Sequence, residues 1–435
     1  MKRKAYNDLL RWKQSDSRKP LLLLGARQVG KTWLMNEFGK NEYDNVAYIN
    51  CDRSRQAAGI FADDYDTDRI LLNIQALTGQ SISPGKTLIV IDEIQEAPRG
   101  ISCLKYFCED KPDYHVMAAG SLLGITLGRK ESFPVGKVDM ITLYPLDFNE
   151  FVEAIAGEMT VRPLLSLDWN VIGPISSMYS ELLRQYYFVG GMPEAVSDFV
   201  AKKDLTSVRR IQSDIIQAYR DDMSKHTTKA ESVRIGQVFE SLPSQLAREN
   251  QKFIFGAVRQ GARAADFEVA IQWLIDAGVI YRVSRVSVIR MPLKFYECLP
   301  EFKLFLLDVG LLGCMAEIPA ASILIRDNSV VEFKGMLTEN YMAQQIKAAG
   351  ITPYYWSKKT SAAEIDFAIQ LNGRAWAVEV KAETNLRAKS LAQYIKDNPG
   401  TQGLRFSMLG YEQWPDVTNI PLFAAESYLE NSTGE

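Results

Sequence analysis

A glycine-rich segment near the start of the chain has the residue types and spacing of a phosphate-binding loop. It follows four consecutive leucines, matches the pattern G-x-x-x-x-G-K-[ST] and runs into a helical pattern. Glycine lets the backbone turn tightly and approach a phosphate, so that consecutive N–H groups and the helix start point at its oxygens. The residues that we expect to bind the phosphates are Gly25, Ala26, Arg27, Gln28, Val29, Gly30, Lys31 and Thr32.

A second strand pattern, at residues 87–92, is apolar from Leu88 to Ile91, and two acids, Asp92 and Glu93, stand at its end. Parallel sheets place their ligands at the carboxyl ends of such strands, so we expect both acids beside the loop. Lys31 places a charge on the terminal phosphates, Thr32 binds Mg²⁺, and Asp92 contacts the ion directly or through a group bound to it. Glu93 is the base that orients the attacking water. The two segments together predict Mg²⁺-dependent ATP hydrolysis.

Two further polar residues are candidates for the same chemistry. Ser121 follows the strand pattern at 114–120, where ring-forming ATPases place a sensor of the γ-phosphate; alternatively, it caps the next helix. Arg129, on the loop beyond, has the charge to stabilise the transition state, in its own chain or in a neighbouring subunit. An arginine in a loop is otherwise a solvated surface residue.

The last third of the chain holds a second group of ionisable residues. Glu339 lies in a helical pattern, Asp366 opens a strand pattern, and Glu379 and Lys381 share a face of the next one. A hairpin turn at 372–373 brings Asp366 alongside. We expect Glu339, Asp366 and Glu379 to bind a metal, and Asp366, Glu379 and Lys381 to act together in phosphodiester cleavage. In the alternative, these side chains are solvated or form ion pairs.

The order of the elements predicts an α/β fold of several domains. Strand patterns at 45–50, 87–92, 114–120 and 137–143 alternate with helical patterns, which is typical of β-α-β crossovers and a parallel sheet. The chain has 435 residues, more than one hydrophobic core usually supports.

Residues 230–300 have the outline of a winged helix, three helical patterns followed by two strand patterns at 279–288 and 293–298. The third helical pattern, at 264–278, carries three acids, whereas the basic residues lie on the strand patterns. In DNA-binding winged helices the third helix enters the major groove. A packing or dimerising winged helix is therefore as well supported as a base-reading one.

The composition is that of an ordinary soluble globular protein, with 47% hydrophobic and 24% charged residues and a net charge of −3. No stretch approaches the roughly 20 apolar residues of a membrane helix. The basic start lacks a following apolar run, and the five cysteines and two histidines lack zinc-site spacing. We therefore expect a cytoplasmic protein without a membrane partner. Residues 201–300 carry 16 basic and 11 acidic side chains, which suits a polyanionic partner or a solvated surface.

These motifs resemble those of bacterial and archaeal AAA-superfamily ATPases with a C-terminal domain of unknown function, number 4143, related to PD-(D/E)XK nucleases. The resemblance covers nearly the whole chain. It rests on Gly25 to Thr32, Ile91 to Gln95, Gly128 and Arg129, Tyr144 to Leu146 with Phe148 and Phe151, Gly190 to Glu194, Asp308 to Leu312, Glu364 to Phe367, and Glu379 to Lys381.

The resemblance implies an ATP and Mg²⁺ site at residues 25–32, Asp92 and Glu93, and a nuclease-like fold for the C-terminus. Ile365 stands where the name-giving motif has a proline before the metal-binding aspartate, which leaves the nuclease activity open. The expected domains are a P-loop ATPase domain (1–160), a helical linker or lid (161–228), a winged-helix-like domain (229–300) and a PD-(D/E)XK nuclease-like domain (301–435).

The expected function is Mg²⁺-dependent ATP hydrolysis coupled to a C-terminal domain that binds or cleaves DNA. The alternative is a nucleotide-switched module that grips DNA or a protein partner, with slow hydrolysis and no cleavage. Candidate partners are DNA, further copies of the chain and another protein.

Overall fold

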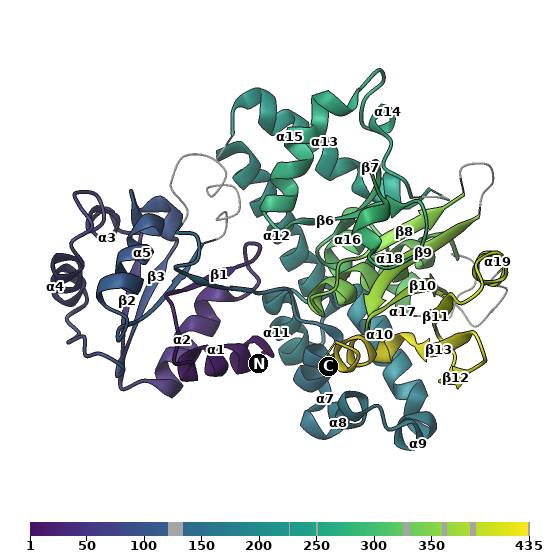
Figure 1. Ribbon diagram of the computed structural model, residues 1–435, viewed down its shortest axis with the longest axis horizontal. Helices are drawn as coiled ribbons and strands as arrows, with labels where there is room; N and C mark the ends of the chain where they lie inside the picture. Colours follow the sequence, from purple (N-terminus) through teal and green to yellow (C-terminus); the bar gives the residue numbers. More distant parts are fainter. Residues whose placement is uncertain are drawn as a thin grey trace. The chain divides into compact units, whose positions relative to one another are not determined.

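The computed structural model describes residues 1–120, 134–225, 227–248, 251–324, 331–358, 363–382 and 389–433, and it divides into two compact units (Figure 1). The N-terminal unit comprises residues 2–144 and 276–278, and the C-terminal unit comprises Met1 and residues 145–275 and 279–435. No described helix is long and apolar enough to cross a membrane.

The N-terminal unit is built on a five-stranded parallel sheet with the strand order β2-β3-β4-β1-β5. The strands β3 and β4 are buried along their whole length, which is why their sequences are apolar on both faces. The predicted parallel α/β sheet is thus confirmed. The elements are α1 (Ala5–Gln14), β1 (Leu21–Leu24), α2 (Lys31–Glu42), β2 (Asn45–Asn50), α3 (Arg55–Gly59), α4 (Thr67–Thr78), β3 (Thr87–Asp92), η1 (Ile94–Glu96), α5 (Gly100–Asp110), β4 (His115–Ala119) and β5 (Asp139–Thr142).

The first half of the C-terminal unit is helical. Long apolar stripes, such as the one on α10, pack these helices on one another. The helices are α7 (Phe148–Ala156), α8 (Glu158–Ser166), α9 (Trp169–Ile172), η2 (Gly173–Ile175), α10 (Ser176–Val189), α11 (Pro193–Lys202), α12 (Leu205–Lys225), α13 (Lys229–Leu246), α14 (Phe255–Val258) and α15 (Ala264–Asp276).

The second half is organised by an eight-stranded mixed sheet with the order β12-β13-β11-β10-β9-β8-β6-β7. Its elements are β6 (Ile280–Val286), η3 (Leu293–Tyr296), β7 (Glu297–Leu306), α16 (Val309–Met315), α17 (Ala320–Leu324), α18 (Val331–Ala348), β8 (Tyr354–Ser357), β9 (Glu364–Leu371), β10 (Arg374–Val380), α19 (Lys389–Asp397), β11 (Gln402–Ser407), β12 (Glu412–Gln413), β13 (Val417–Pro421), η4 (Leu422–Ala424) and α20 (Ala425–Asn431).

Two predicted hairpins are present in this sheet. The strands β6 and β7 pair antiparallel, as expected for the wing, but the second strand runs over Glu297–Leu306 instead of the predicted 293–298, because Leu293–Tyr296 form η3. The strand β6 also pairs with β8, so the wing continues the C-terminal sheet. The predicted boundary between residues 300 and 301 falls inside β7; the four domain ranges otherwise stay predictions. The second hairpin, β9–β10, turns at Asn372 and Gly373, whose φ angles of 48° and 68° suit a tight hairpin turn.

The turn between α10 and α11 is held by a buried carboxylate. Asp308 accepts hydrogen bonds from the backbone N–H of Gly191 (2.6 Å) and of Leu311 (2.9 Å). Gly190 has a φ of 73°, and a Cβ placed on it would lie 2.2 Å from Asp308 Oδ1. Only glycine fits this position, because any other residue would be strained at this φ angle and its Cβ would clash with the carboxylate of Asp308.

Candidate functional sites

The phosphate-binding loop connects β1 to α2 in the N-terminal unit. Gly25 has a φ of 136°, and a Cβ there would lie 2.2 Å from the carbonyl oxygen of Leu143, so the loop can pass β5 only with glycine at this place. Gly30 is the N-cap of α2 with a φ of 95°. Both glycines that the pattern requires are therefore at positions that other residues fill only with strain.

Lys31 is buried at the start of α2, and its ammonium donates to the carbonyl oxygens of Gly25 (2.8 Å) and Ala26 (2.7 Å). Burial lowers the pKa of Lys31 to about 8, and the charges of Glu93 and Asp92 oppose that shift. The ammonium group therefore lies inside the loop, and a bound phosphate oxygen can replace the two carbonyl groups to which it donates.

The loop and the end of β3 meet through one carboxylate oxygen. Thr32 Oγ1 donates to Asp92 Oδ2 over 2.8 Å, and the hydroxyl of Tyr48 donates to the same oxygen over 2.8 Å. Tyr48 lies on β2, which pairs with β3, and no sequence pattern marks this residue as part of the site. The hydroxyl of Thr32 and the carboxylate of Asp92 are the hard oxygen donors that Mg²⁺ prefers, so the residues fit the ion.

Glu93 follows directly in a left-handed backbone conformation, with a φ of 51°. Its carboxylate accepts a hydrogen bond from Gln95 Nε2 (2.6 Å), and its backbone N–H donates to Asp92 Oδ1 (3.1 Å). The bend turns Glu93 away from the direction of β3, and Gln95 holds its carboxylate. Such conformations cost about 1–3 kcal/mol and are typical of functional positions.

Arg3 is a second residue of the site that no sequence pattern marks. It is 7% exposed, and its guanidinium donates to the carbonyl oxygens of Val29 (2.9 Å) and Tyr144 (2.6 Å). The contact fixes the middle of the loop to the end of β5. Ser121 and Arg129 lie outside the described residues, so their predicted roles stay predictions.

The C-terminal unit brings the second predicted group together around two lysines. On the α18 side, the buried Lys303 of β7 pairs with Glu364 and with Glu339 (3.5 Å), and Gln251 Nε2 donates to the other oxygen of Glu339 (2.9 Å). Lys303 was not predicted, since it lies on a strand far from Glu339 in the sequence. It provides the ion pair that the alternative interpretation requires for Glu339.

On the strand side, the predicted neighbours are in place. Lys381 Nζ lies 2.7 Å from Glu379 Oε1, and Asp366 Oδ2 accepts a hydrogen bond from the N–H of Val380 (2.7 Å). The other carboxylate oxygen, Glu379 Oε2, is buried and has no hydrogen-bond partner among the described residues. A buried carboxylate oxygen without a hydrogen-bond partner can bind a cation, so Glu379 fits the role of a metal ligand.

The cluster carries an excess of buried negative charge. Burial raises the pKa of all four acids, of Glu339 to about 8, and the two lysines oppose the shift. Burial alone would lower the pKa of Lys303. The negative charges of Glu339, Glu364 and Asp366 have the larger effect, so the pKa of Lys303 is raised. Four carboxyl groups against two ammonium groups are neutralised either by protons or by one divalent cation.

A tighter set of acids elsewhere in the C-terminal unit has another explanation. Among the described residues, Asp147, Glu426 and Glu430 place three carboxylate oxygens within 4.8 Å of one another. The N–H of Asn149 donates to Glu426 (2.9 Å), and all three acids have further partners. This set is part of the packing between α7 and α20.

Three family models match successive parts of the chain. Residues 17–152 match the family described as AAA domain, residues 180–322 match a domain of unknown function (DUF8612), and residues 334–414 match another (DUF4143). The range that matches the AAA domain contains the phosphate-binding loop and both acids, Asp92 and Glu93. A search of curated proteins gives no match.

Among solved structures, the chain is similar to a Walker-type ATPase of Pyrococcus abyssi, with 14% identity, 72% of this chain and 95% of that chain covered, and a TM-score of 0.44. It is also similar to the Orc1 protein of Aeropyrum pernix in complex with DNA, with 12% identity, 74% and 92% covered, and a TM-score of 0.28. Both TM-scores are below 0.5, so neither likeness describes the arrangement of the whole chain.

Proposed function

We propose that the N-terminal unit binds ATP with Mg²⁺ and hydrolyses it. The observation that carries this proposal is the 2.8 Å hydrogen bond from Thr32 Oγ1 to Asp92 Oδ2, which joins the phosphate-binding loop to the acids at the end of β3. Match of this region to the AAA domain family supports the same assignment.

Each residue has a distinct task in this proposal. The ammonium of Lys31 exchanges its two carbonyl partners for phosphate oxygens, and the N–H groups of the loop orient the same phosphates. Glu93 holds the attacking water and accepts its proton, with Gln95 fixing the carboxylate. Mg²⁺, when bound at Thr32 and Asp92, neutralises charge on the phosphates.

Equilibrium binding of a fluorescent ATP analogue tests the site without requiring turnover. Lys31→Ala removes the charged donor and is expected to weaken binding at least tenfold, since hydrogen bonds to charged groups contribute about 1.5–3 kcal/mol. Lys40→Ala is the matched control, an exposed lysine on the same helix. Equal affinity of Lys31→Ala and the parent protein would show that the loop does not bind the nucleotide.

We propose for the C-terminal unit a nuclease-like site that takes one divalent cation and binds DNA. The orphaned oxygen of Glu379 and the excess of buried carboxylates support it. Asp366 and Glu379 are the ligands, together with Glu339 if Lys303 releases it. Lys381 steadies the charge that develops on the phosphate. ATP hydrolysis is coupled to this unit in the proposal.

The role of Lys381 separates a metal site from an ion-pair site. In a metal site, Lys381→Ala keeps Mn²⁺ binding and stops DNA cleavage, because the carboxylates still hold the ion. In an ion-pair site the same change leaves Glu379 unpaired and is expected to cost about 3 kcal/mol of stability. Mn²⁺ titration, a cleavage assay and thermal unfolding of the parent, Asp366→Ala and Lys381→Ala distinguish the two. A parent protein without metal binding or cleavage would rule out the nuclease.

A further inference from the structure

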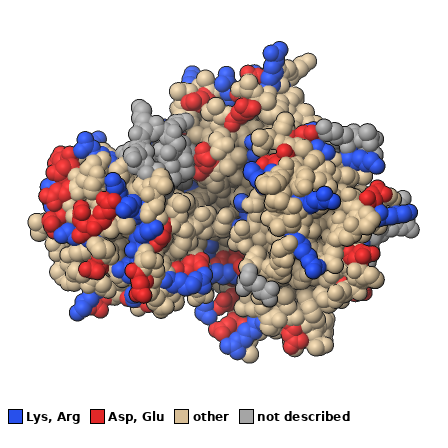
Figure 2. Space-filling view, in the orientation of Figure 1, with Lys and Arg blue, Asp and Glu red and all other residues tan. Residues whose placement is uncertain are grey.

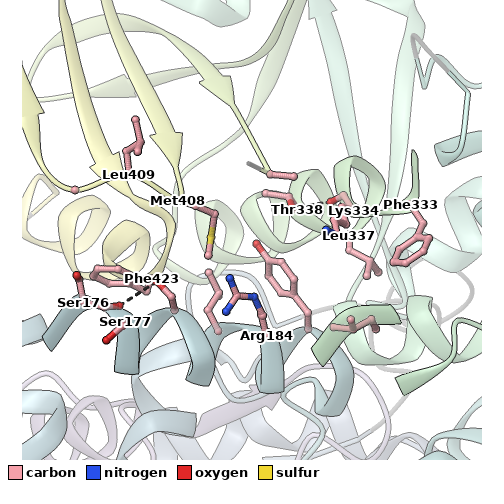
Figure 3. A pocket seen from close by; sticks show the side chains of 16 residues that line it. Ser176, Ser177, Arg184, Phe333, Lys334, Leu337, Thr338, Met408, Leu409 and Phe423 are labelled. Carbon is pink, nitrogen blue, oxygen red and sulfur yellow. Dashed lines mark hydrogen bonds between the residues drawn. The ribbon is translucent and has the colours of Figure 1, made fainter. Parts of the chain in front are cut away.

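A pocket of about 430 Å³ lies in the C-terminal unit at the carboxyl ends of three parallel strands (Figure 3). Its lining residues Ala382, Met408 and Phe423 come within two residues of the ends of β10, β11 and β13. Open α/β sheets bind their ligands outside these strand ends. The volume is within the range of small-molecule sites, about 300–1,000 Å³.

The lining combines an apolar wall with positive charge. In Figure 3 the side chain of Arg184 rises from α10 beside Met408, opposite Leu337 and Thr338 on α18. Among the described residues, the lining includes Arg184 and Lys334 and no acid. Within the described chain, Arg184 has neither a hydrogen bond nor an ion pair. The pocket therefore suits a ligand with a flat apolar part and an anionic group.

A buried phenol is a second sign of a missing ligand. Tyr187 lines the pocket and is 9% exposed, and its hydroxyl has no hydrogen bond of normal distance and angle among the described residues, with Thr338 as a weak neighbouring partner. Thr338 lies beside it but donates its own hydroxyl to the carbonyl of Lys334 (2.7 Å). Buried hydroxyl groups normally have a partner, so a polar atom of a ligand would complete this one.

Two residues that line the pocket are direct neighbours, in the sequence, of residues in the carboxylate cluster. Ala382 directly follows Lys381, and Thr338 directly precedes Glu339 on α18. A polyanionic strand whose phosphodiester reaches the cluster is therefore within reach of the pocket. We propose that the pocket binds one unpaired nucleotide of a nucleic-acid strand, with its base against the apolar wall and its phosphate at Arg184. This proposal rests on the nucleic-acid binding proposed above.

The occupant follows from the shape and chemistry of the lining. A base inside a duplex is stacked and paired, so it enters a pocket only after it has been flipped out, whereas an unpaired base enters directly. Aromatic walls bind bases by stacking regardless of sequence. Single-stranded DNA is therefore the substrate class that we assign to the C-terminal unit.

Fluorescence measurements on the full chain in EDTA test this assignment, because the pocket does not require a metal ion. The probes are single-stranded DNA with one 2-aminopurine and the same sequence as a duplex. We expect the parent to bind the single strand more tightly and to quench the 2-aminopurine. Arg184→Gln is expected to weaken single-strand binding about tenfold or more and leave duplex binding unchanged. Ser177→Glu, on the exposed rim, should act in the same direction by repulsion.

The matched control is Arg210→Gln, an exposed arginine of the same unit outside the pocket, which should bind both probes like the parent. Loss of binding to both probes in Arg184→Gln, unchanged binding to both, or a parent that does not bind the single strand would overturn the proposal. So would stabilisation of the parent, but not of Arg184→Gln, by a fatty acid. Binding without any cleavage when Mg²⁺ is added would instead disprove the nuclease and keep the pocket.

Discussion

At the scale of single residues, the nucleotide site is a set of local contacts completed by a few distant ones. The loop and the pair of acids each form a short segment with a recognisable pattern at the carboxyl end of an apolar strand. Because such strand ends meet at one edge of a parallel sheet, the sequence alone predicts that the two segments lie close together. Tyr48 and Arg3 reach the site from other elements. Their roles depend on the strand order β2-β3 and on the position of the chain's start, and no local pattern specifies either of these.

Lys303 shows the same limit in the C-terminal cluster. It comes from β7, which crosses the predicted boundary between the winged-helix-like and nuclease-like domains, and it pairs with Glu364 and Glu339. A lysine in an apolar strand has no signature of its own. Its role as a counter-ion can be predicted only when the positions of the acids that face it are known.

His115 predicts how the N-terminal unit responds to acid. Burial, with the charges of Arg18 and Lys13, lowers its pKa to about 4, and the hydroxyl of Tyr43 lies 2.7 Å from Nδ1. Between pH 6.5 and 4, His115 is protonated in the unfolded chain but not in the folded chain. The free energy of unfolding therefore decreases as the pH falls, by about 2–3 kcal/mol at the acid end of this range.

His115→Asn is expected to remove this part of the pH dependence. Thermal unfolding of the parent and of the variant between pH 7 and about 4.5 measures it. An equal loss of stability in the two proteins over that range would contradict the assignment to His115.

At the scale of elements, the helices and strands of both units follow from periodicity, whereas their packing depends on a few special positions. The turn between α10 and α11 is an example, because Gly190 and Gly191 meet Asp308 and Leu146, far away in the sequence. The glycine pair predicts a turn. Only the structure shows that the turn is also the contact surface for the buried N-cap of α16.

Gly190→Ala tests this contact. The methyl group would lie 2.2 Å from Asp308 Oδ1, at a φ of 73°, so we expect a loss of about 3 kcal/mol or more and a Tm lower by about 5 °C or more. Gly236→Ala is the control: it lies on α13, with nothing within 4 Å of the added methyl, and should be neutral or slightly stabilising. Equal Tm values for the two variants would disprove the role of the turn.

At the scale of the whole molecule, the chain combines a P-loop domain with a unit whose mixed sheet carries the carboxylate cluster. The α/β class and the parallel sheet could be predicted, since each strand is a short apolar run. The continuation of β6–β7 into the C-terminal sheet could not, because the pairing between β6 and β8 joins strands that are separated in the sequence by η3, β7, α16, α17 and α18.

Charge at this scale gives little guidance to the partner. On the face shown in Figure 2, Lys and Arg lie interspersed with Asp and Glu, without one continuous basic field. The surplus of basic residues at 201–300 is therefore a weak argument for DNA. The site chemistry, rather than the surface charge, supports the nucleic-acid proposal.

Steady-state ATP turnover by the parent protein and by Glu93→Gln is the decisive measurement for the N-terminal site. We expect the parent to release phosphate only with Mg²⁺, faster with single-stranded DNA if the units are coupled. Glu93→Gln should bind ATP like the parent and hydrolyse it at least about 100-fold more slowly, since it keeps the phosphate contacts and loses the base. Undiminished turnover in Glu93→Gln would contradict the account, and tight ATP binding without turnover in the parent would favour a nucleotide-switched binding protein.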